Sequence, residues 1–148
     1  MVEIPANKEC ETRRSVMFLV YMVKEEKYVI EERTREDSYY KGLFIIPAGH
    51  VENGETSLDT LKRELLEEQN IEPLEYIHLD RFKNKSLSEI IYDTDAYLIQ
   101  SFTGDWKNNE TDKCNLHQMT FEEANEKMEY AYNKYVLLMA ELLLRKNS

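Results

Sequence analysis

The chain has 148 residues, of which 42% are hydrophobic and 32% are charged, and its formal net charge is −10. This length and composition predict a soluble single domain, residues 1–148, with its own hydrophobic core. The acidic balance argues against binding to a nucleic-acid backbone, and no apolar run is long enough to span a bilayer. A phosphorylated small molecule would have to be held through recruited cations or a few local basic side chains.

Cysteine usage and the N-terminal sequence both favour a reducing compartment. Cys10 and Cys114 are far apart and lack the spacing of a metal site, so we expect two reduced structural thiols. The first residues contain no apolar signal core, so a cytoplasmic location is expected.

The first part of the chain predicts three strands. Residues 15–23 form a continuous apolar run with β-branched and aromatic members, which is typical of a buried strand. Residues 28–33 follow a short charged turn and predict the second arm of a hairpin. Residues 43–48 predict a short strand that ends at Pro47.

A helix is predicted from about Ser57 to Gln69. Thr56 or Ser57 can cap its N-terminus, and Thr56 with Asp59 three residues later matches a capping box. Asn70 suits the helix end, because asparagine tolerates the left-handed backbone conformation found there.

The second part of the chain predicts two strands at residues 72–84 and 89–104, paired antiparallel, and a short strand at 116–120. Thr120 and Glu123 form a second capping-box pattern that opens a helical segment over residues 121–146. Its apolar stripe predicts either core packing or a homodimer face. The sum of these elements is an α/β sandwich, with helices on the faces of a mixed sheet.

Three glutamates, Glu64, Glu67 and Glu68, lie within five residues of one another on the predicted helix. Residues three and four apart share a helix face, where like charges repel and raise one another's pKa unless a cation compensates. Mg²⁺ prefers carboxylate oxygens, and Glu55 and Arg63 could orient them. Taken alone, such a pattern is more often a solvated face in a chain rich in glutamate.

The spacing around this cluster is far more specific. It runs Gly49, five residues, Glu55, seven residues, Arg63-Glu64, an apolar residue, one residue, Glu67-Glu68, one residue, Asn70 and Ile71. This pattern resembles the Nudix box, the signature of the Nudix hydrolase family, and departs from it only where Asn70 replaces glycine. Family-like features extend over residues 13–126.

The resemblance implies a Nudix-type α/β/α sandwich around a central mixed β-sheet. It also implies an enzyme that hydrolyses a pyrophosphate bond in a nucleoside diphosphate derivative, with Mg²⁺, or Mn²⁺ as a substitute. By matching positions, the implied catalytic residues are Glu64, Glu67 and Arg63.

The remaining roles also follow from the resemblance. Gly49 and Glu55 would support the motif structurally. The implied metal ligands are Glu64, Glu67, Glu68, the backbone carbonyl of Ala48 and, from a distal loop, Glu110. For Glu110 the alternative is an acidic loop residue that is simply exposed to solvent.

Substrate class follows by exclusion within the family. Sequence markers of the ADP-ribose, NADH, dinucleoside polyphosphate and coenzyme A branches are missing, which leaves nucleoside triphosphates, standard or damaged. Arg33 is the candidate for a phosphate contact. Base stacking is open to Phe18, Phe44 and other aromatic residues, for which core packing is the alternative: Tyr39, Tyr40 and Trp106.

Two other functions remain to be weighed. A Nudix-fold module could bind a nucleotide or nucleotide sugar as a sensor without significant hydrolysis. An unrelated acidic interaction domain would require the spacing to be accidental. The expected partner is a small-molecule nucleotide, with no nucleic acid and no membrane, and a homodimer stays open.

Overall fold

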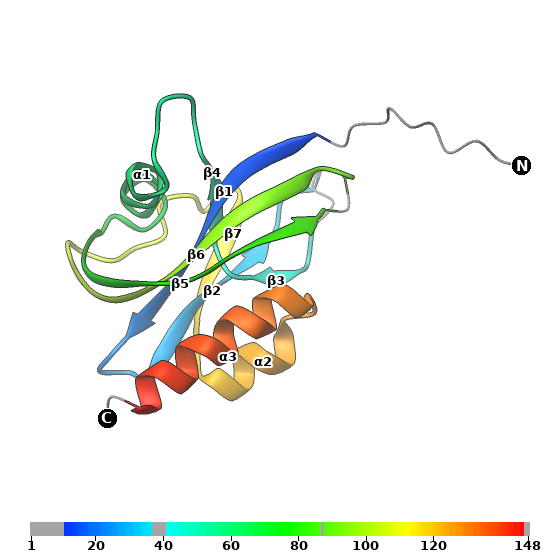
Figure 1. Ribbon diagram of the computed structural model, residues 1–148. Helices are drawn as coiled ribbons and strands as arrows, with labels where there is room; N and C mark the ends of the chain where they lie inside the picture. The colour runs from blue at the N-terminus through cyan, green and yellow to red at the C-terminus, as the bar shows by residue number, and fades with distance from the viewer. Residues whose placement is uncertain (1–10, 37–40, 87, 147–148) are drawn as a thin grey trace, which may run out of the picture.

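The computed structural model describes residues 11–36, 41–86 and 88–146. The predicted order of strands and helices is confirmed, except that the strand predicted over residues 43–48 and the helical segment predicted over residues 121–146 are each divided in two (Figure 1). The elements are β1 (Thr12–Met22), β2 (Lys27–Arg33), β3 (Phe44–Ile45), β4 (Ala48–His50), α1 (Ser57–Gln69), β5 (Glu72–Lys85), β6 (Ile91–Thr103), β7 (Cys114–Met119), α2 (Phe121–Lys127) and α3 (Ala131–Lys146).

The strands form a mixed sheet in the order β3-β2-β1-β6-β5, with β4 paired to β1 and β7 paired to β2. Strands β5 and β6 pair antiparallel as predicted, whereas β1 and β6 pair parallel. Helix α1 covers one face of the sheet, and α2 and α3 cover the other (Figure 1). The architecture is therefore the expected α/β/α sandwich.

Strand β1 explains why its sequence is a continuous apolar run. Its side chains alternate between the two faces, and both faces are covered. Phe18 packs in the cluster beneath α1, with Leu61 and Leu65 of that helix. Met17 and Leu19 pack in the opposite cluster, against α2 and α3. The strand therefore lies between two hydrophobic clusters, one on each face of the sheet.

The segment predicted as one strand over residues 43–48 is two short strands instead. Pro47 separates β3 from β4, because it has no N–H to donate to a ladder. The Pro47 carbonyl accepts a hydrogen bond from the Phe18 N–H at 2.9 Å. Strand β4 then pairs with β1, with Gly49 opposite Val16, and carries the chain toward α1.

The helical C-terminus predicted over residues 121–146 is also divided. The Met128 backbone is extended, with φ −76° and ψ 135°, and its buried side chain fills the cluster between α2, α3 and the sheet. The break lets both helices pack on the same face. Val136, Leu137 and Ala140 of α3 are core residues, whereas the homodimer stays a prediction.

Helix α1 has the ends that its sequence predicts. The Asp59 N–H donates to Thr56 Oγ1 at 3.1 Å, and the Thr56 N–H donates to Asp59 Oδ2 at 2.9 Å, which completes the capping box. At the other end, Asn70 is left-handed, with φ 58° and ψ 36°. In the second predicted box, Thr120 caps α2 by accepting from the Glu123 N–H.

The Thr56 cap gives a direct test of local stability. We expect Thr56→Ala to lower the free energy of unfolding by about 1 kcal/mol, because it leaves an N-terminal amide of α1 without its acceptor. For a chain of this size the melting temperature should fall by about 2–4 °C. Thermal unfolding checks this, with Thr111→Ala in an exposed turn as the control. Equal losses in both variants would contradict the assignment.

Candidate active site

Helix α1 presents the predicted carboxylates beside strand β4. Glu68 is 8% exposed, and Glu64 is also largely buried. Glu67 lies nearer to solvent, with a side chain 52% exposed. The three residues therefore share a face, as their spacing predicts. Their exposure to solvent increases in the order Glu68, Glu64, Glu67.

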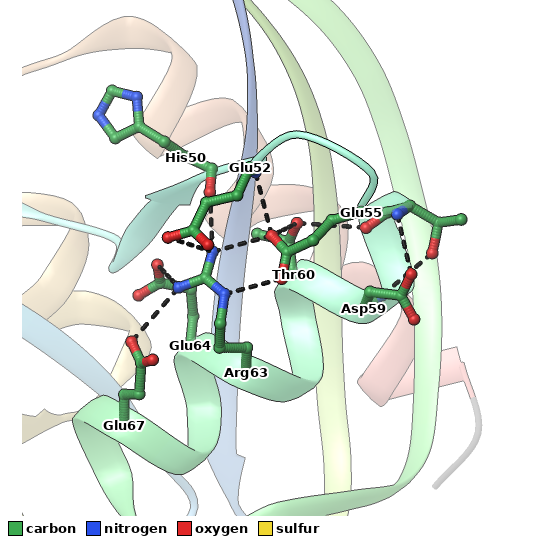
Figure 2. A network of polar contacts seen from close by, with 9 residues as sticks. His50, Glu52, Glu55, Asp59, Thr60, Arg63, Glu64 and Glu67 are labelled. Atoms are coloured by element: carbon green, nitrogen blue, oxygen red, sulfur yellow. Dashed lines mark hydrogen bonds and ion pairs between the residues drawn. The ribbon is translucent and has the colours of Figure 1, made fainter.

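Arg63 is the centre of the polar network around this face (Figure 2). Its Nε donates to Glu55 Oε2 at 2.8 Å, and its Nη1 donates to Glu64 Oε1 at 2.9 Å. The same Nη1 reaches Glu67 Oε2 at 3.3 Å, and Nη2 donates to the His50 carbonyl at 3.0 Å. One guanidinium thus links the loop after β4 to two glutamates of α1.

The charges in this network shift one another's ionisation. Hydrogen bonds from Arg63, followed by one from the Glu52 N–H, lower the pKa of Glu55 to about 2. The bonds to Glu55 in turn raise the pKa of Arg63 above its usual value. Glu55 is therefore ionised near neutral pH and accepts two hydrogen bonds from Arg63, a geometry in keeping with the supporting role that the motif implies for it.

Gly49 lies in close contact with the side chain of Glu64. A Cβ at position 49 would lie 2.3 Å from Glu64 Cδ and 2.5 Å from both Glu64 Cγ and Oε1. Real Cβ atoms do not approach other atoms so closely, so any other residue here would force the Glu64 carboxylate or strand β4 to move. Strand β4 and helix α1 therefore meet with a carboxylate packed directly on the backbone.

Glu68 is a buried carboxylate with one unsatisfied oxygen. Its Oε2 is buried and has no hydrogen-bond partner among the described residues. Burial raises the pKa of Glu68 to about 9, and the charges of Glu31, Glu64 and Glu110 add to this effect. Burial also raises the pKa of Glu64. Such carboxylates are costly unless a cation compensates them.

In the metal-free protein, Glu68 should make the fold less stable as the pH rises. Its folded pKa of about 9 lies above the usual 4.5, so between these values the folded protein keeps a proton that the unfolded chain has released. The free energy of unfolding therefore falls through this window, and Glu68→Gln should flatten that slope. Denaturant unfolding in EDTA at about pH 6 and about pH 8.5 checks this. Equal slopes in both proteins would contradict it.

Glu110 and Glu31 bring two further carboxylates to the cluster. Glu110 lies in the loop before β7, and its charge helps to raise the pKa of Glu64 and Glu68. Glu31 of β2 is 2% exposed and binds Arg33 Nη1 at 3.0 Å. Sequence reasoning missed Glu31, because an acidic residue followed by Glu32 and Arg33 is typical of a solvated strand face.

A cavity of about 440 Å³ opens beside this cluster. Glu31, Arg33, Ala48 and Gly49 line the side of the cavity that borders the carboxylates. Sequence reasoning identified none of the residues on its other sides, because they come from separate elements and follow no motif. They include His50, Asn84, Lys85, Tyr92, Tyr130, Tyr132 and Asn133.

The structure brings only one of the three predicted substrate contacts to this cavity. Arg33 lines it, and the Arg33 Nε is buried without a partner among the described residues. Phe18 is instead fully buried, because its side chain points to the face of the sheet that α1 covers. Phe44 packs against His117, with centroids 5.7 Å apart, and does not line the cavity.

The other predicted residues are placed as follows. Trp106 packs against the cluster under α1, and its Nε1 donates to Gln69 Oε1 at 2.7 Å. Cys114 is a buried free thiol whose pKa is raised to about 12, chiefly by burial. Tyr39, Tyr40 and Cys10 lie outside the described residues.

The donor set fits a hard divalent cation by its chemistry. In the described part of the chain, no three His, Cys, Asp or Glu side chains converge in ready metal-binding geometry, and the Arg63 guanidinium lies between Glu64 and Glu67. The unsatisfied Glu68 Oε2 and the Glu64 side chain seated on Gly49 nevertheless supply oxygen ligands of the kind Mg²⁺ prefers.

Comparison with known proteins agrees with the fold and the motif. A family model described as the NUDIX domain matches residues 11–139, and the chain therefore belongs to this family. It is a Nudix hydrolase, as the spacing of Glu55, Arg63 and the three glutamates predicts. No curated protein sequence matches the chain. Among the described residues, no helix is long and apolar enough to cross a membrane.

Solved structures show the same fold at low sequence identity. A structure from work on MutT of Aliivibrio salmonicida and Vibrio cholerae is 20% identical, with a TM-score of 0.73, and the match covers 89% of this chain and 99% of that one. A MutT NUDIX hydrolase from Burkholderia pseudomallei is 16% identical, with a TM-score of 0.73, and covers 87% and 98%. The NUDIX domain of Shewanella oneidensis NrtR complexed with ADP ribose is 14% identical, with a TM-score of 0.71, and covers 97% and 94%.

Proposed function

We propose that the protein hydrolyses a pyrophosphate bond of a nucleoside triphosphate, standard or damaged, and that it requires Mg²⁺, with Mn²⁺ as a substitute. The observation that carries this proposal is the buried Glu68 carboxylate, whose Oε2 is unsatisfied and whose pKa is raised by burial and by the charges of Glu31, Glu64 and Glu110. Of these carboxylates, Glu31 also lines the cavity. A buried cluster of this kind is an expensive arrangement that a bound cation would stabilise.

The ligands in this proposal are those that the motif implies. Glu64, Glu67, Glu68 and the carbonyl of Ala48 would hold the cation, with Glu110 as a further ligand or base. When bound, the cation would neutralise pyrophosphate oxygens and lower the pKa of an attacking water.

Protein side chains would position the water and the substrate. Arg63 fixes the direction of the Glu64 carboxylate through a 2.9 Å hydrogen bond, which suits Glu64 to accept a proton from water. Arg33, held by Glu31 at the border between cluster and cavity, would contact a phosphate. Its buried Nε lacks a partner among the described residues and could donate to such an oxygen.

The cavity supports a nucleoside as the organic part of the substrate. Its volume of about 440 Å³ is in the range that holds small organic ligands. Tyr92, Tyr130 and Tyr132 give it aromatic walls on which a planar base could pack. The Asn133 Oδ1 accepts a hydrogen bond from the Ile46 N–H at 2.7 Å. The amide nitrogen of Asn133 points away from that bond and could donate to the substrate.

A nucleotide screen tests the proposal. The protein is incubated with standard and oxidised nucleoside triphosphates, ADP-ribose and nucleotide sugars in Mg²⁺, and products are separated by chromatography. Hydrolysis in H₂¹⁸O identifies the attacked phosphorus from the labelled product. We expect turnover of triphosphates that stops in EDTA. Tight nucleotide binding with no product over hours would instead favour a sensor, and turnover unaffected by EDTA would contradict the metal.

A further inference from the structure

Asn70 occupies the one position where this chain departs from the Nudix box. Its left-handed backbone, with φ 58° and ψ 36°, is one that glycine adopts freely. Its side chain adds something that glycine cannot provide. Asn70 Nδ2 donates to the Asp105 carbonyl at 2.9 Å, across 35 residues of sequence. The departure therefore creates a contact between the end of α1 and a distant loop.

The same loop docks on the end of α1 through several other hydrogen bonds. Trp106 Nε1 donates to Gln69 Oε1 at 2.7 Å, and the Lys107 N–H donates to the Gln69 carbonyl at 3.2 Å. The Asn109 N–H donates to the Glu68 carbonyl at 2.9 Å. The N–H groups of Lys107 and Asn109 thus satisfy backbone carbonyls that the last turn of an α-helix leaves without intrahelical partners.

A glycine stands on the loop side of this contact. Gly104 has φ +106°, and a Cβ there would lie 2.6 Å from the Asn70 carbonyl oxygen. The close approach of the two backbones thus depends on Gly104, while Asn70 supplies the side-chain hydrogen bond. Loop and helix end fit each other at this point.

The docked loop leads directly to Glu110. Asn109, which binds the carbonyl of Glu68, immediately precedes it, and the Glu110 N–H donates to Asn108 Oδ1 at 2.9 Å. The position of the Glu110 carboxylate beside Glu64 and Glu68 therefore depends on how residues 104–110 sit on α1.

We propose that Asn70 is a positioning residue, which tethers residues 104–110 to the end of α1 and so holds Glu110 beside the carboxylates of Glu64 and Glu68. The Trp106–Gln69 hydrogen bond is the second attachment of this tether. The proposal rests on the proposed function for the cation, but the tether itself can be measured without activity.

The decisive variant is Asn70→Gly, which restores the residue of the family motif. Glycine can keep the left-handed conformation, and the change removes the side chain with the amide that donates to the Asp105 carbonyl. We expect the dissociation constant for Mn²⁺, measured by electron paramagnetic resonance of the free ion, to rise about three- to tenfold, at or below the usual effect of losing an outer-shell partner. Trp106 is the one tryptophan of the chain, so its fluorescence reports on the loop, and acrylamide should quench it more strongly.

Two further variants separate the tether from other effects. Glu26→Gly changes another left-handed non-glycine residue, with φ 54°, in the turn between β1 and β2, and should leave both readouts unchanged. Trp106→Phe keeps an aromatic ring but removes the N–H donor, and should also weaken Mn²⁺ binding. Asn70→Gly should lower the melting temperature by no more than about 2–4 °C, because it removes one exposed hydrogen bond and leaves the core intact.

Two results would overturn the proposal: unchanged quenching in Asn70→Gly, or a loosened loop with parental Mn²⁺ binding. A parent protein that binds no Mn²⁺ would contradict the proposed function itself. Acrylamide quenching of Trp106 fluorescence, measured on the metal-free protein, would still decide whether the tether exists. The two failures can therefore be told apart.

Discussion

Glu67→Gln should reduce nucleotide hydrolysis in saturating Mg²⁺ by about 10²- to 10³-fold, which corresponds to roughly 3–4 kcal/mol of transition-state stabilisation. The substitution preserves the shape of the side chain and removes its negative charge. Stability should change little, because Glu67 is 52% exposed and makes one long contact, 3.3 Å, to Arg63. A loss of activity without a loss of fold would assign Glu67 to the chemistry.

Glu52→Gln is the matched control for this variant. Glu52 is also an exposed glutamate, 67% exposed, with an ion pair to Arg63 at 3.7 Å, but it stands at one of the five unspecified positions between Gly49 and Glu55. We expect it to retain activity close to that of the parent protein. If Glu67→Gln and the parent turn over nucleotide at the same rate, Glu67 is not a metal ligand.

Gly49→Ala should have the second large effect, because it acts on Glu64 through volume alone. The new Cβ would lie 2.3 Å from Glu64 Cδ, so the carboxylate or strand β4 must move. We expect a loss of about 1–3 kcal/mol in the free energy of unfolding, as for other overpacked sites. Displacing a catalytic group by about 1 Å can cost on the order of 10²-fold in rate, which is the activity loss we expect.

Two comparisons isolate the contact between Gly49 and Glu64. Gly54 lies in the loop before α1, has φ +84° and has no atom within 4 Å of an added Cβ. Gly54→Ala should therefore cost stability through backbone strain while largely keeping activity. In a Glu64→Ala background, Gly49→Ala should cost much less stability than it does alone, and a full cost in that background would refute the contact.

Within the candidate site, the residues of the motif were easier to predict from the sequence than the residues that would contact the substrate. Glu64, Glu67 and Glu68 share one face of α1, as their spacing predicts, because their relative directions follow from the period of the helix. Arg63 and Glu55 also meet, since Glu55 lies just before the N-cap of α1 and Arg63 lies in the middle of the same helix. Of the predicted substrate contacts, Arg33 lines the cavity. Phe18 lies in the core and Phe44 does not line the cavity.

Local sequence is sufficient to predict the features that depend on neighbours along the chain. The capping box at Thr56, the left-handed end at Asn70 and the common face of the glutamates are set by backbone geometry within a few residues. Tertiary structure alone decided which side chains from distant segments meet. Glu31 is inward-facing only because β2 has two covered faces, and the Asn70 amide finds Asp105 only because the loop before β7 crosses the end of α1. Such contacts depend on the packing of the whole sheet, which no local pattern of residues encodes.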